Sequence, residues 1–566
     1  MTMNRAFLCV LMALIALSAL WANGKPAKRY LGAGWDVGAL PPVDMAQSLD
    51  LLAKLPLDGI RFSFRAKFPD GTNITSSTAM DGRKWPVDVF DPQFDDVRKI
   101  TALPNMKHCF IGVRATPNKR LAWTDDAAWE AFAHNMTVLA RAAKMTGVKG
   151  LSPDYEDYRH QFQYSLEDCD PPLDETLALA RRRGAEVHHA IFAAYPDMTL
   201  FFWHFLDRHF PHHFTGFTDL PQDVRMRQDL FIAYLNGLFD VLPPTARIVA
   251  CEEDYKYSAA RRDFYKAIAE EKQFNEQLLD PVHRKKHRLQ VSLGFAIYLD
   301  AYRHDNQKSQ WALGPDRHGS FAGHLIEDVE QATRATDEYV WFWGEKRTYV
   351  PWRNPGIASG IYSCRQYSGD RRQTWDSLFP GFHDSLFRFK DPCGYARKAW
   401  ASVLSGGGDG NVIAGSSCTS LDGFMTWQKK RAHEGTFGID GTVGDGDTSS
   451  IVMNGVHGCV TAYARNCKSG SRYLVRVVSR GEGDAGVGVS VSWLKNGKWD
   501  FKTPSVQIPA VGITSSGWTE HLAVVDVPEG NDGFGVKMCG TLRRGQRVWF
   551  DNPSVHEMPP YPEERK

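Results

Sequence analysis

Short apolar runs alternate with longer amphipathic stretches along the first two thirds of the chain. A short apolar run bounded by turn residues is typical of a buried strand, and apolar residues at every third or fourth position are typical of a helix. The pattern predicts strands at residues 30–36, 59–64, 109–115, 150–156, 199–205, 247–253, 290–300 and 339–345. The stretches between them predict helices, among them 44–55, 124–145 and 175–194. Eight strands alternating with helices predict a (β/α)8 barrel, with an open doubly wound sheet as the alternative.

The hydrophobic period changes near residue 430. Beyond it, turn residues separate short runs of alternating apolar and polar positions, at 473–478, 486–493, 521–527, 533–538 and 548–555. This pattern predicts an all-β sandwich. The preceding stretch, residues 405–423, is rich in Gly and Ser and is typical of a loop or linker. We therefore predict a barrel domain over residues 25–404, a linker over 405–429 and a β-sandwich domain over 430–560.

The N-terminus has the features of a secretory signal peptide over residues 1–24. Arg5 supplies the positive charge, residues 6–20 the apolar core, and Ala22-Asn23-Gly24 a small-residue cleavage site. The apolar core is too short for a membrane span, and no later run without charges reaches that length. We therefore expect an exported protein, secreted or periplasmic, with no membrane span.

The composition sets further limits on function. A chain of 566 residues has room for two or three domains, and 43% hydrophobic and 23% charged residues are ordinary for a soluble globular protein. The net charge of +1 gives no indication of nucleic acid as a partner. No GxGxxG or P-loop pattern follows a predicted strand, and no CxxC pair or Cys/His cluster has the spacing of a zinc site. The sequence therefore predicts no cofactor for catalysis.

The predicted strand at 150–156 ends in a burst of carboxylates. Side chains alternate between the two faces of a strand, so Gly150, Ser152, Asp154 and Glu156 share one face. This small and then acidic face suits the inside of a barrel near an active-site mouth. Two carboxylates so close together raise each other's pKa, which would keep Glu156 protonated near neutral pH. The alternative interpretation is an acidic loop that caps the next helix.

Other polar and aromatic residues gather at the predicted C-terminal ends of the strands, the ends that form the active-site face of a (β/α)8 barrel. Any one of them could have a structural role, but their shared placement predicts an active site. Glu252 is the carboxylate we favour on the sixth strand. We predict that the substrate is bound by Asp36, Arg61, His204, Tyr298, Asp300, Trp341, Trp343 and Glu345.

Residues 430–560 resemble the jelly-roll carbohydrate-binding modules of bacterial polysaccharide hydrolases. The resemblance is carried by the strand at Tyr473, by the step Ser516-Gly517-Trp518 and by the closing Trp549-Phe550-Asp551. In that superfamily the closing strand often carries an aspartate at a structural calcium ion. The resemblance therefore implies that Asp551 is a candidate calcium ligand. It also implies either a sugar-binding domain or a plain accessory fold.

Residues 30–400 resemble (β/α)8-barrel glycoside hydrolases. The step Asp154-Tyr155-Glu156 is similar to the Asp-x-Glu that ends the fourth strand in chitinase-like enzymes. This resemblance implies that Glu156 is the general acid and that Asp154 orients the N-acetyl group of the substrate, which acts as the nucleophile. It also implies that Trp343 floors the sugar site. The sequence departs from that family where Gly150 and Ser152 replace its earlier aspartates.

Together these features predict an exported glycoside hydrolase that acts on an oligosaccharide or polysaccharide. Glycosidic cleavage needs an acid for the leaving oxygen and a second group for the anomeric carbon. Glu156 is the predicted acid, and the second group is either Asp154 working through the substrate or Glu252. One alternative is a non-catalytic glycan-binding protein on a degenerate barrel. Another is a metal-dependent barrel hydrolase, although the first strand lacks the His-x-His of the commonest metal site.

Overall fold

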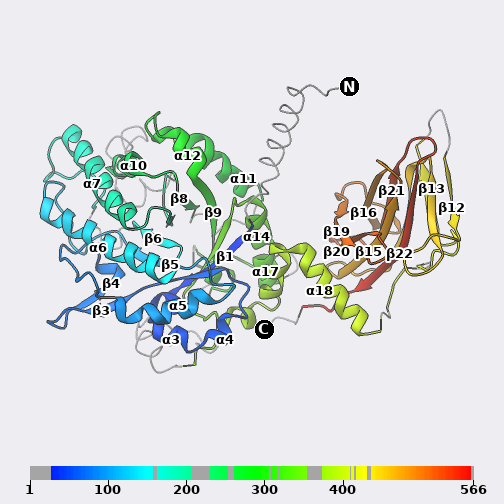
Figure 1. Cartoon of the computed structure of the whole chain (residues 1–566), viewed down its shortest axis with the longest axis horizontal. Helices are drawn as coiled ribbons and strands as arrows, with labels where there is room; N and C mark the ends of the chain where they lie inside the picture. The colour runs from blue at the N-terminus through cyan, green and yellow to red at the C-terminus, as the bar shows by residue number, and fades with distance from the viewer. Residues whose placement is uncertain are drawn as a thin grey trace, which may run out of the picture. The chain divides into compact units, whose positions relative to one another are not determined.

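The structure is a computed structural model that describes residues 27–156, 162–206, 230–252, 261–304, 308–309, 311–316, 319–353, 373–407, 410–413, 416–429 and 435–561. The predicted signal peptide lies outside these residues. The chain forms two compact units, divided between Leu386 and Phe387 (Figure 1). Each unit has a core of its own and is described separately below.

Parallel strands of the first unit close into a barrel. Its order, within the described part of the chain, is β1-β10-β9-β8-β7-β6-β5-β2. These strands are β1 (Arg29–Gly34), β2 (Gly59–Phe62), β5 (Phe110–Arg114), β6 (Gly150–Asp154), β7 (Thr199–Phe202), β8 (Arg247–Glu252), β9 (Val291–Tyr298) and β10 (Tyr339–Gly344). The barrel prediction is confirmed, and the closed order excludes the open doubly wound sheet.

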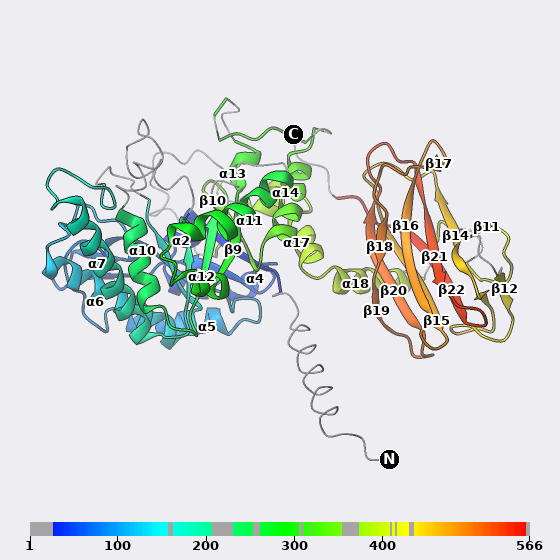
Figure 2. The same cartoon turned by 90° about the horizontal axis from the view of Figure 1, so that it is seen from above.

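Helices surround the barrel strands (Figures 1 and 2). The longer ones are α5 (Phe94–Ala102), α6 (Asp126–Thr146), α7 (Leu173–Ala194), α10 (Leu230–Val241), α11 (Arg261–Ala269), α12 (Arg284–Gln290), α14 (Phe321–Ala335) and α17 (Phe382–Lys390). In α6 the carboxylate of Asp125 accepts the Ala128 N–H at 3.1 Å, and Gly147 ends the helix in a left-handed conformation with φ of +71°. None of the helices in the described residues combines the length and apolar composition needed to cross a lipid bilayer.

Shorter elements fill the connections. They are α2 (Trp35–Ala39), α3 (Pro42–Ala46), α4 (Leu49–Leu52), β3 (Arg65–Lys67), β4 (Asn73–Thr75), η1 (Ser76–Thr78), η2 (Asp91–Gln93), η4 (Glu270–Phe274), η5 (Asn275–Leu278), α13 (Leu299–Tyr302) and α16 (Trp375–Leu378). The helix predicted at 44–55 is therefore two short helices, α3 and α4. Met45 of α3 and Leu52 of α4 are both buried. The apolar stripe in the sequence therefore marks buried positions, although they lie on two helices rather than one.

Alternate residues of the strands fill the inside of the barrel. Phe110 belongs to this interior cluster, and it lies opposite Gly150 in the register of β5 and β6. The same register places Ser152 and Asp154 on the inner face, as the sequence predicted. The interior cluster consists of Leu31, Ala33, Phe110, Phe201, Trp203, Val249, Cys251, Ala296, Tyr339 and Trp341.

The second unit is an antiparallel β-sandwich, as predicted. One sheet has the order β11-β14-β21-β16-β17, with β18 beside β16, and the other has the order β12-β13-β22-β15-β20-β19. Val460, Val491 and Val536 of the first sheet pack against Val475 and Phe550 of the second to form the core. The strands are β11 (Phe424–Gln428), β12 (Thr436–Asp440), β13 (Ser450–Asn454), β14 (His457–Arg465), β15 (Arg472–Gly481), β16 (Gly486–Lys495), β17 (Lys498–Trp499), β18 (Val506–Ile508), β19 (Ala510–Ile513), β20 (Thr519–Asp526), β21 (Gly533–Thr541) and β22 (Arg547–Glu557).

Helix α18 (Pro392–Ser405) belongs to the second unit. It packs on a small apolar cluster around Leu474 and Leu522, and its Tyr395 hydroxyl accepts a hydrogen bond from Arg472 at 3.1 Å. The sequence placed this helix in the barrel domain and β11 in the linker. Both pack with the sandwich instead, so the division between units comes earlier than the predicted boundary at residue 404.

Candidate active site

Two carboxylates lie at the C-terminal end of β6. Asp154 is the last residue of the strand and is 5% exposed, and its Oδ1 accepts the backbone N–H of Glu156 at 2.9 Å. Glu156 follows just beyond the strand, with its side chain 26% exposed. Burial, and then the charge of Glu156, raise the pKa of Asp154 to about 7. The structure thus provides a carboxyl group that gains or loses a proton near neutral pH.

Two basic side chains face this acidic pair. The Nε2 of His204 is 3.7 Å from the Oε1 of Glu156, and His204 is buried. The charges of Arg61 and His204 both lower the pKa of Asp154, against the larger effect of burial. The site therefore holds groups that stabilise negative charge on either carboxylate.

Arg61 reaches across the barrel interior. Its guanidinium lies 4.0 Å from the ring centroid of Trp203, and its Nε donates to the Ser152 hydroxyl at 3.3 Å. A Cβ atom at Gly112 would lie 2.4 Å from the Arg61 Cζ, so only glycine at that position leaves room for the guanidinium. The small residues Gly112 and Ser152 thus leave space for a partly buried cation whose charge acts on Asp154.

A cluster of three tryptophan side chains extends from Arg61 to β10. Trp203 is stacked on Trp341, with ring centroids 4.8 Å apart, and meets Trp343 edge-on at 4.9 Å. Trp341 is completely buried in the interior cluster, whereas Trp343 is partly exposed and donates its Nε1–H to Glu345 at 3.0 Å. Tyr298 lies opposite Trp343 in the strand register. Trp343 therefore lies at the edge of the interior, and Trp341 lies inside it.

Asp36 and Asp300 fix the segment that follows β10. Asp36 is completely buried and accepts the Tyr349 N–H at 3.0 Å, while Asp300 accepts the Glu345 N–H at 2.7 Å. Burial raises the pKa of Asp36 to about 6 and that of Asp300 to about 7. In the structure, both predicted substrate-binding residues hold backbone in place, and through it they position Glu345 and Trp343.

Glu252 is the last residue of β8, but its side chain lies outside the described set, as do Glu253 and Asp254. The inner face of β8 carries Val249 and Cys251. The choice of Glu252 as the second catalytic group therefore stays a prediction.

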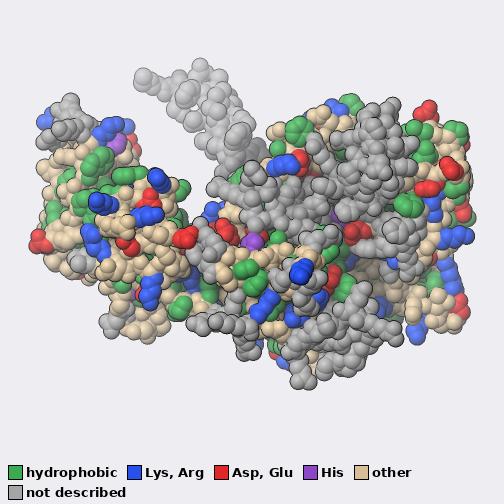
Figure 3. All heavy atoms as spheres, turned by 180° about the vertical axis from the view of Figure 1, so that it is seen from behind, with side chains coloured by type: hydrophobic (Ala, Val, Ile, Leu, Met, Phe, Trp, Pro, Cys, Tyr) green, Lys and Arg blue, Asp and Glu red, His purple; other side chains and the backbone are tan. Residues whose placement is uncertain are grey.

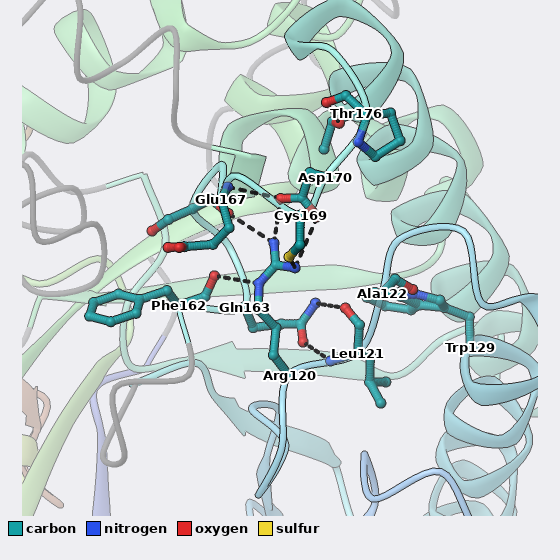
Figure 4. Close-up of polar contacts among 12 residues, drawn as sticks. Arg120, Leu121, Ala122, Trp129, Phe162, Gln163, Glu167, Cys169, Asp170 and Thr176 are labelled. Atoms are coloured by element: carbon teal, nitrogen blue, oxygen red, sulfur yellow. Dashed lines mark hydrogen bonds and ion pairs between the residues drawn. The ribbon is translucent and has the colours of Figure 1, made fainter.

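The loops after β5 and β6 are fastened to each other by an ion pair and hydrogen bonds. Both terminal nitrogens of Arg120 donate to the Asp170 carboxylate, at 2.9 and 2.6 Å, and its Nε donates to the Phe162 carbonyl at 3.2 Å (Figure 4). Gln163 accepts the Leu121 N–H and donates to the Leu121 carbonyl. This bidentate pair and its neighbours hold the two loops in a defined relative position.

Sequence reasoning missed Trp203 and Arg120. Trp203 follows directly after β7 and shares parity with Phe201 on its inner face, and this two-residue period was the signal that could have found it. Arg120 lies in a loop, and its partner Asp170 is 50 residues away. No local pattern indicates such a contact.

The outer face of the first sheet in the second unit carries a groove of about 550 Å³. Trp427 is 54% exposed and Phe501 89% exposed, and both line the groove together with Trp499. The ammonium group of Lys537 lies 4.5 Å from the Trp499 ring centroid. Among the described residues that line the groove, none carries a carboxylate. Elsewhere on the described surface, acidic and basic side chains are interspersed on the face that Figure 3 shows.

Asp551 on β22 is completely buried in the second unit. Its two carboxylate oxygens accept the N–H groups of Asp445 and Asn552, each at 2.7 Å. Among the described residues, no three His, Cys, Asp or Glu side chains are grouped so that they could hold a metal ion. Asp551 therefore orders the backbone at Asp445, and a structural calcium ion at Asp551 stays a prediction.

The fold and the site define a protein with a closed (β/α)8 barrel, a carboxylate pair at the C-terminal end of its fourth strand, and a β-sandwich unit. The sequence matches no protein-family model and no curated protein. Solved structures of glycoside hydrolases and carbohydrate-binding modules are similar to parts of the chain.

Three of these structures illustrate the similarity. The enzymatically active domain of bacteriophage CBA120 tailspike protein 4 has 16% identity and a TM-score of 0.22, over 26% of this chain and 21% of that chain. The CBM22-1–GH10 modules of the Clostridium thermocellum N-terminal endo-1,4-β-D-xylanase 10B, complexed with xylohexaose, have 15% identity and a TM-score of 0.21, over 27% and 29% of the two chains. TmCBM61, in complex with β-1,4-galactotriose, has 14% identity and a TM-score of 0.19, over 26% and 99%. This chain covers less than a third of the length of the tailspike and xylanase chains. The fold assignment rests on the strand topology.

Proposed function

We propose that the protein is an exported glycoside hydrolase that cleaves O-glycosidic bonds of an oligosaccharide or polysaccharide. The observation that carries this proposal is the pair Asp154 and Glu156 at the C-terminal end of β6, with the pKa of Asp154 raised to about 7. Carboxyl groups with a pKa near the working pH are suited to general acid/base catalysis. Export is proposed from the N-terminal sequence alone.

In the proposed mechanism Glu156 donates a proton to the leaving oxygen. Its partial exposure gives a substrate access, and the nearby His204 stabilises the carboxylate that remains after the proton has left. The charge of Glu156 raises the cost of ionising Asp154. Arg61 limits that cost while the pair is ionised.

The second catalytic requirement is a group for the anomeric carbon. The resemblance to chitinase-like enzymes assigns this role to an N-acetyl group of the substrate that Asp154 orients. Glu252 is the alternative group, as the carboxylate at the end of β8. Trp343 supplies an apolar face for the C–H groups of a sugar ring.

The groove on the second unit supports a second candidate function, which is glycan binding. Trp427, Trp499 and Phe501 present aromatic rings on one sheet face, and such rings stack on sugars. A glycan-binding protein with a barrel that lacks catalysis is the corresponding alternative for the whole chain. Hydrolysis, measured on a panel of polysaccharides and oligosaccharides, distinguishes the two.

The decisive variant is Glu156→Gln. Loss of a general acid lowers turnover by a factor on the order of 10²–10⁴, and the loss should be smaller on substrates with very good leaving groups because they need little protonation. Glu327→Gln is the matched control, because Glu327 is exposed on α14 and distant in sequence from the acidic strand. The proposal fails if folded Glu156→Gln keeps near-full activity on a substrate with a poor leaving group.

A further inference from the structure

Two cysteines face each other on the floor of the groove in the second unit. Cys459 on β14 and Cys539 on β21 are directly opposite in the antiparallel register. Residues opposite each other share one face of the sheet, and both cysteines line the groove. Cys459 is buried and Cys539 is partly exposed. Both sulfurs thus border the groove, and Cys539 is the more exposed of the two.

The backbone geometry suits a covalent bond between them. Directly opposite residues of antiparallel strands have Cα atoms about 4.5–5.5 Å apart, and disulfides join Cα atoms about 4.4–6.8 Å apart. The Cα separation of the pair therefore falls within the range of a disulfide. The other buried cysteines of this unit have different neighbours, since Cys418 contacts Asp551 and Cys467 contacts Tyr473.

The surroundings also favour the reactive form of one thiol. The Cys539 thiol donates a hydrogen bond to the Cys459 sulfur, and this bond, with Thr461 and the charge of Lys537, lowers the pKa of Cys459 to about 6. The hydrogen bond to Cys459 and burial raise the pKa of Cys539. The lowered pKa favours the thiolate form of Cys459 and the raised pKa favours the protonated form of Cys539, as in a nucleophilic and a resolving cysteine.

We propose that Cys459 and Cys539 are a redox-active pair that closes to a cross-strand disulfide on the groove floor by exchange with a small-molecule disulfide such as oxidised glutathione. The Cys459 thiolate attacks one sulfur of oxidised glutathione, forms a mixed disulfide and releases one glutathione thiolate. That thiolate takes the proton of Cys539, whose sulfur then attacks the Cys459 sulfur and releases the second glutathione. Two cysteines lose two electrons in total, and one oxidised glutathione becomes two thiols.

This proposal is independent of the hydrolase function. The test is equilibration of the full-length protein in buffers of increasing oxidised-to-reduced glutathione ratio, followed by acid quenching, alkylation and peptide mapping by mass spectrometry. We expect a peptide cross-linked through Cys459 and Cys539 to replace the two alkylated peptides as the ratio rises. Reduction should restore both alkylated peptides.

Three single variants separate the steps. Cys539→Ser removes the resolving thiol, so one glutathione should accumulate on Cys459. Cys459→Ser should leave Cys539 without an adduct under the same conditions. Cys467→Ser is the matched control and should keep the wild-type cross-link.

The peptide map of the wild-type protein tests the proposal even if a variant fails to fold. Two free thiols in the folded wild-type protein at the most oxidising ratio would overturn the proposal. A disulfide from Cys459 or Cys539 to any other cysteine would overturn it as well, and so would a mixed disulfide on the wild-type protein that is never resolved.

Discussion

Replacing Asp154 by asparagine should stabilise the barrel while it abolishes most of the activity. Asparagine has nearly the same shape, and its amide oxygen can still accept the Glu156 N–H that Asp154 accepts at 2.9 Å. What the substitution removes is the negative charge, which burial makes unfavourable in the folded state. Stability and catalysis should therefore change in opposite directions at this position.

The size of the effect follows from the pKa. An ordinary aspartate has a pKa of 3.8 and that of Asp154 is about 7. At one pKa unit per about 1.36 kcal/mol, the ionised Asp154 lowers the free energy of unfolding by up to about 4 kcal/mol. Arg61 and His204 lose a partner in the variant, so we expect a net gain of about 2–4 kcal/mol, or up to roughly 5 °C in Tm for a unit of this size.

The sign of the pH dependence is fixed by the direction of the shift. Because the pKa of Asp154 is raised in the folded state, the native protein holds a proton that the unfolded chain releases between about pH 4 and pH 7. The stability of the wild-type protein relative to the variant is highest below pH 4 and falls as the pH rises to about 7. The variant should therefore be clearly more stable at pH 8 and about equal at pH 4.

Calorimetry of the full-length protein at pH 4 and pH 8 measures this difference, with Asp328→Asn as the matched control. Asp328 is completely buried on α14, where burial also raises its pKa to about 7 and the Tyr302 hydroxyl donates to it at 2.6 Å. The control should show a similar pH-dependent gain in stability and keep its activity. An Asp154→Asn protein whose stability relative to wild type is the same at both pH values would refute the reasoning.

Four further perturbations test other parts of the structure. Trp341→Ala should lower the free energy of unfolding by about 3–5 kcal/mol in urea denaturation, whereas Trp343→Ala should reduce turnover more than Tm; equal effects on stability would contradict the difference in depth. Gly112→Ala places a Cβ atom against the Arg61 guanidinium, so turnover should fall by roughly 10²-fold with an unchanged circular dichroism spectrum, and full activity would show that Arg61 is not needed in its place. A truncated chain ending at Lys390 should fold and cleave small soluble substrates but bind polymer more weakly than the full-length protein, because a second tethered site raises the effective concentration; an insoluble product would contradict the division into two units.

The inner face of β6 could be predicted from sequence because a strand has a period of two. Gly150 and Ser152 are small, and they precede Asp154 on the same face. Depth along the barrel could not be predicted in this way. Trp341 and Trp343 share parity, but Trp341 lies opposite Leu31 and Trp343 lies one layer further along, opposite Ala33.

The roles of individual carboxylates depended on contacts that no local pattern contains. Asp36 stands near a strand end, as the sequence indicated, but β1 ends at Gly34 and the carboxylate binds the backbone of Tyr349, more than 300 residues away. A strand-end carboxylate can bind substrate or hold a neighbouring loop. Sequence alone does not distinguish these two uses.

The association of α18 with the sandwich determines which piece of the chain could be exchanged between proteins. A transplanted segment that starts at residue 430 would lack both α18 and β11. It would expose the apolar surface around Leu474 and Leu522 and leave β14 as an open edge strand, and both features promote aggregation. A segment that starts at Asp391 begins with its own N-cap, because the Asp391 carboxylate accepts the Gly394 N–H at 2.8 Å. We therefore expect recombination or domain grafting to yield soluble fusions when the junction falls at this aspartate, and insoluble ones when it falls at the change of period.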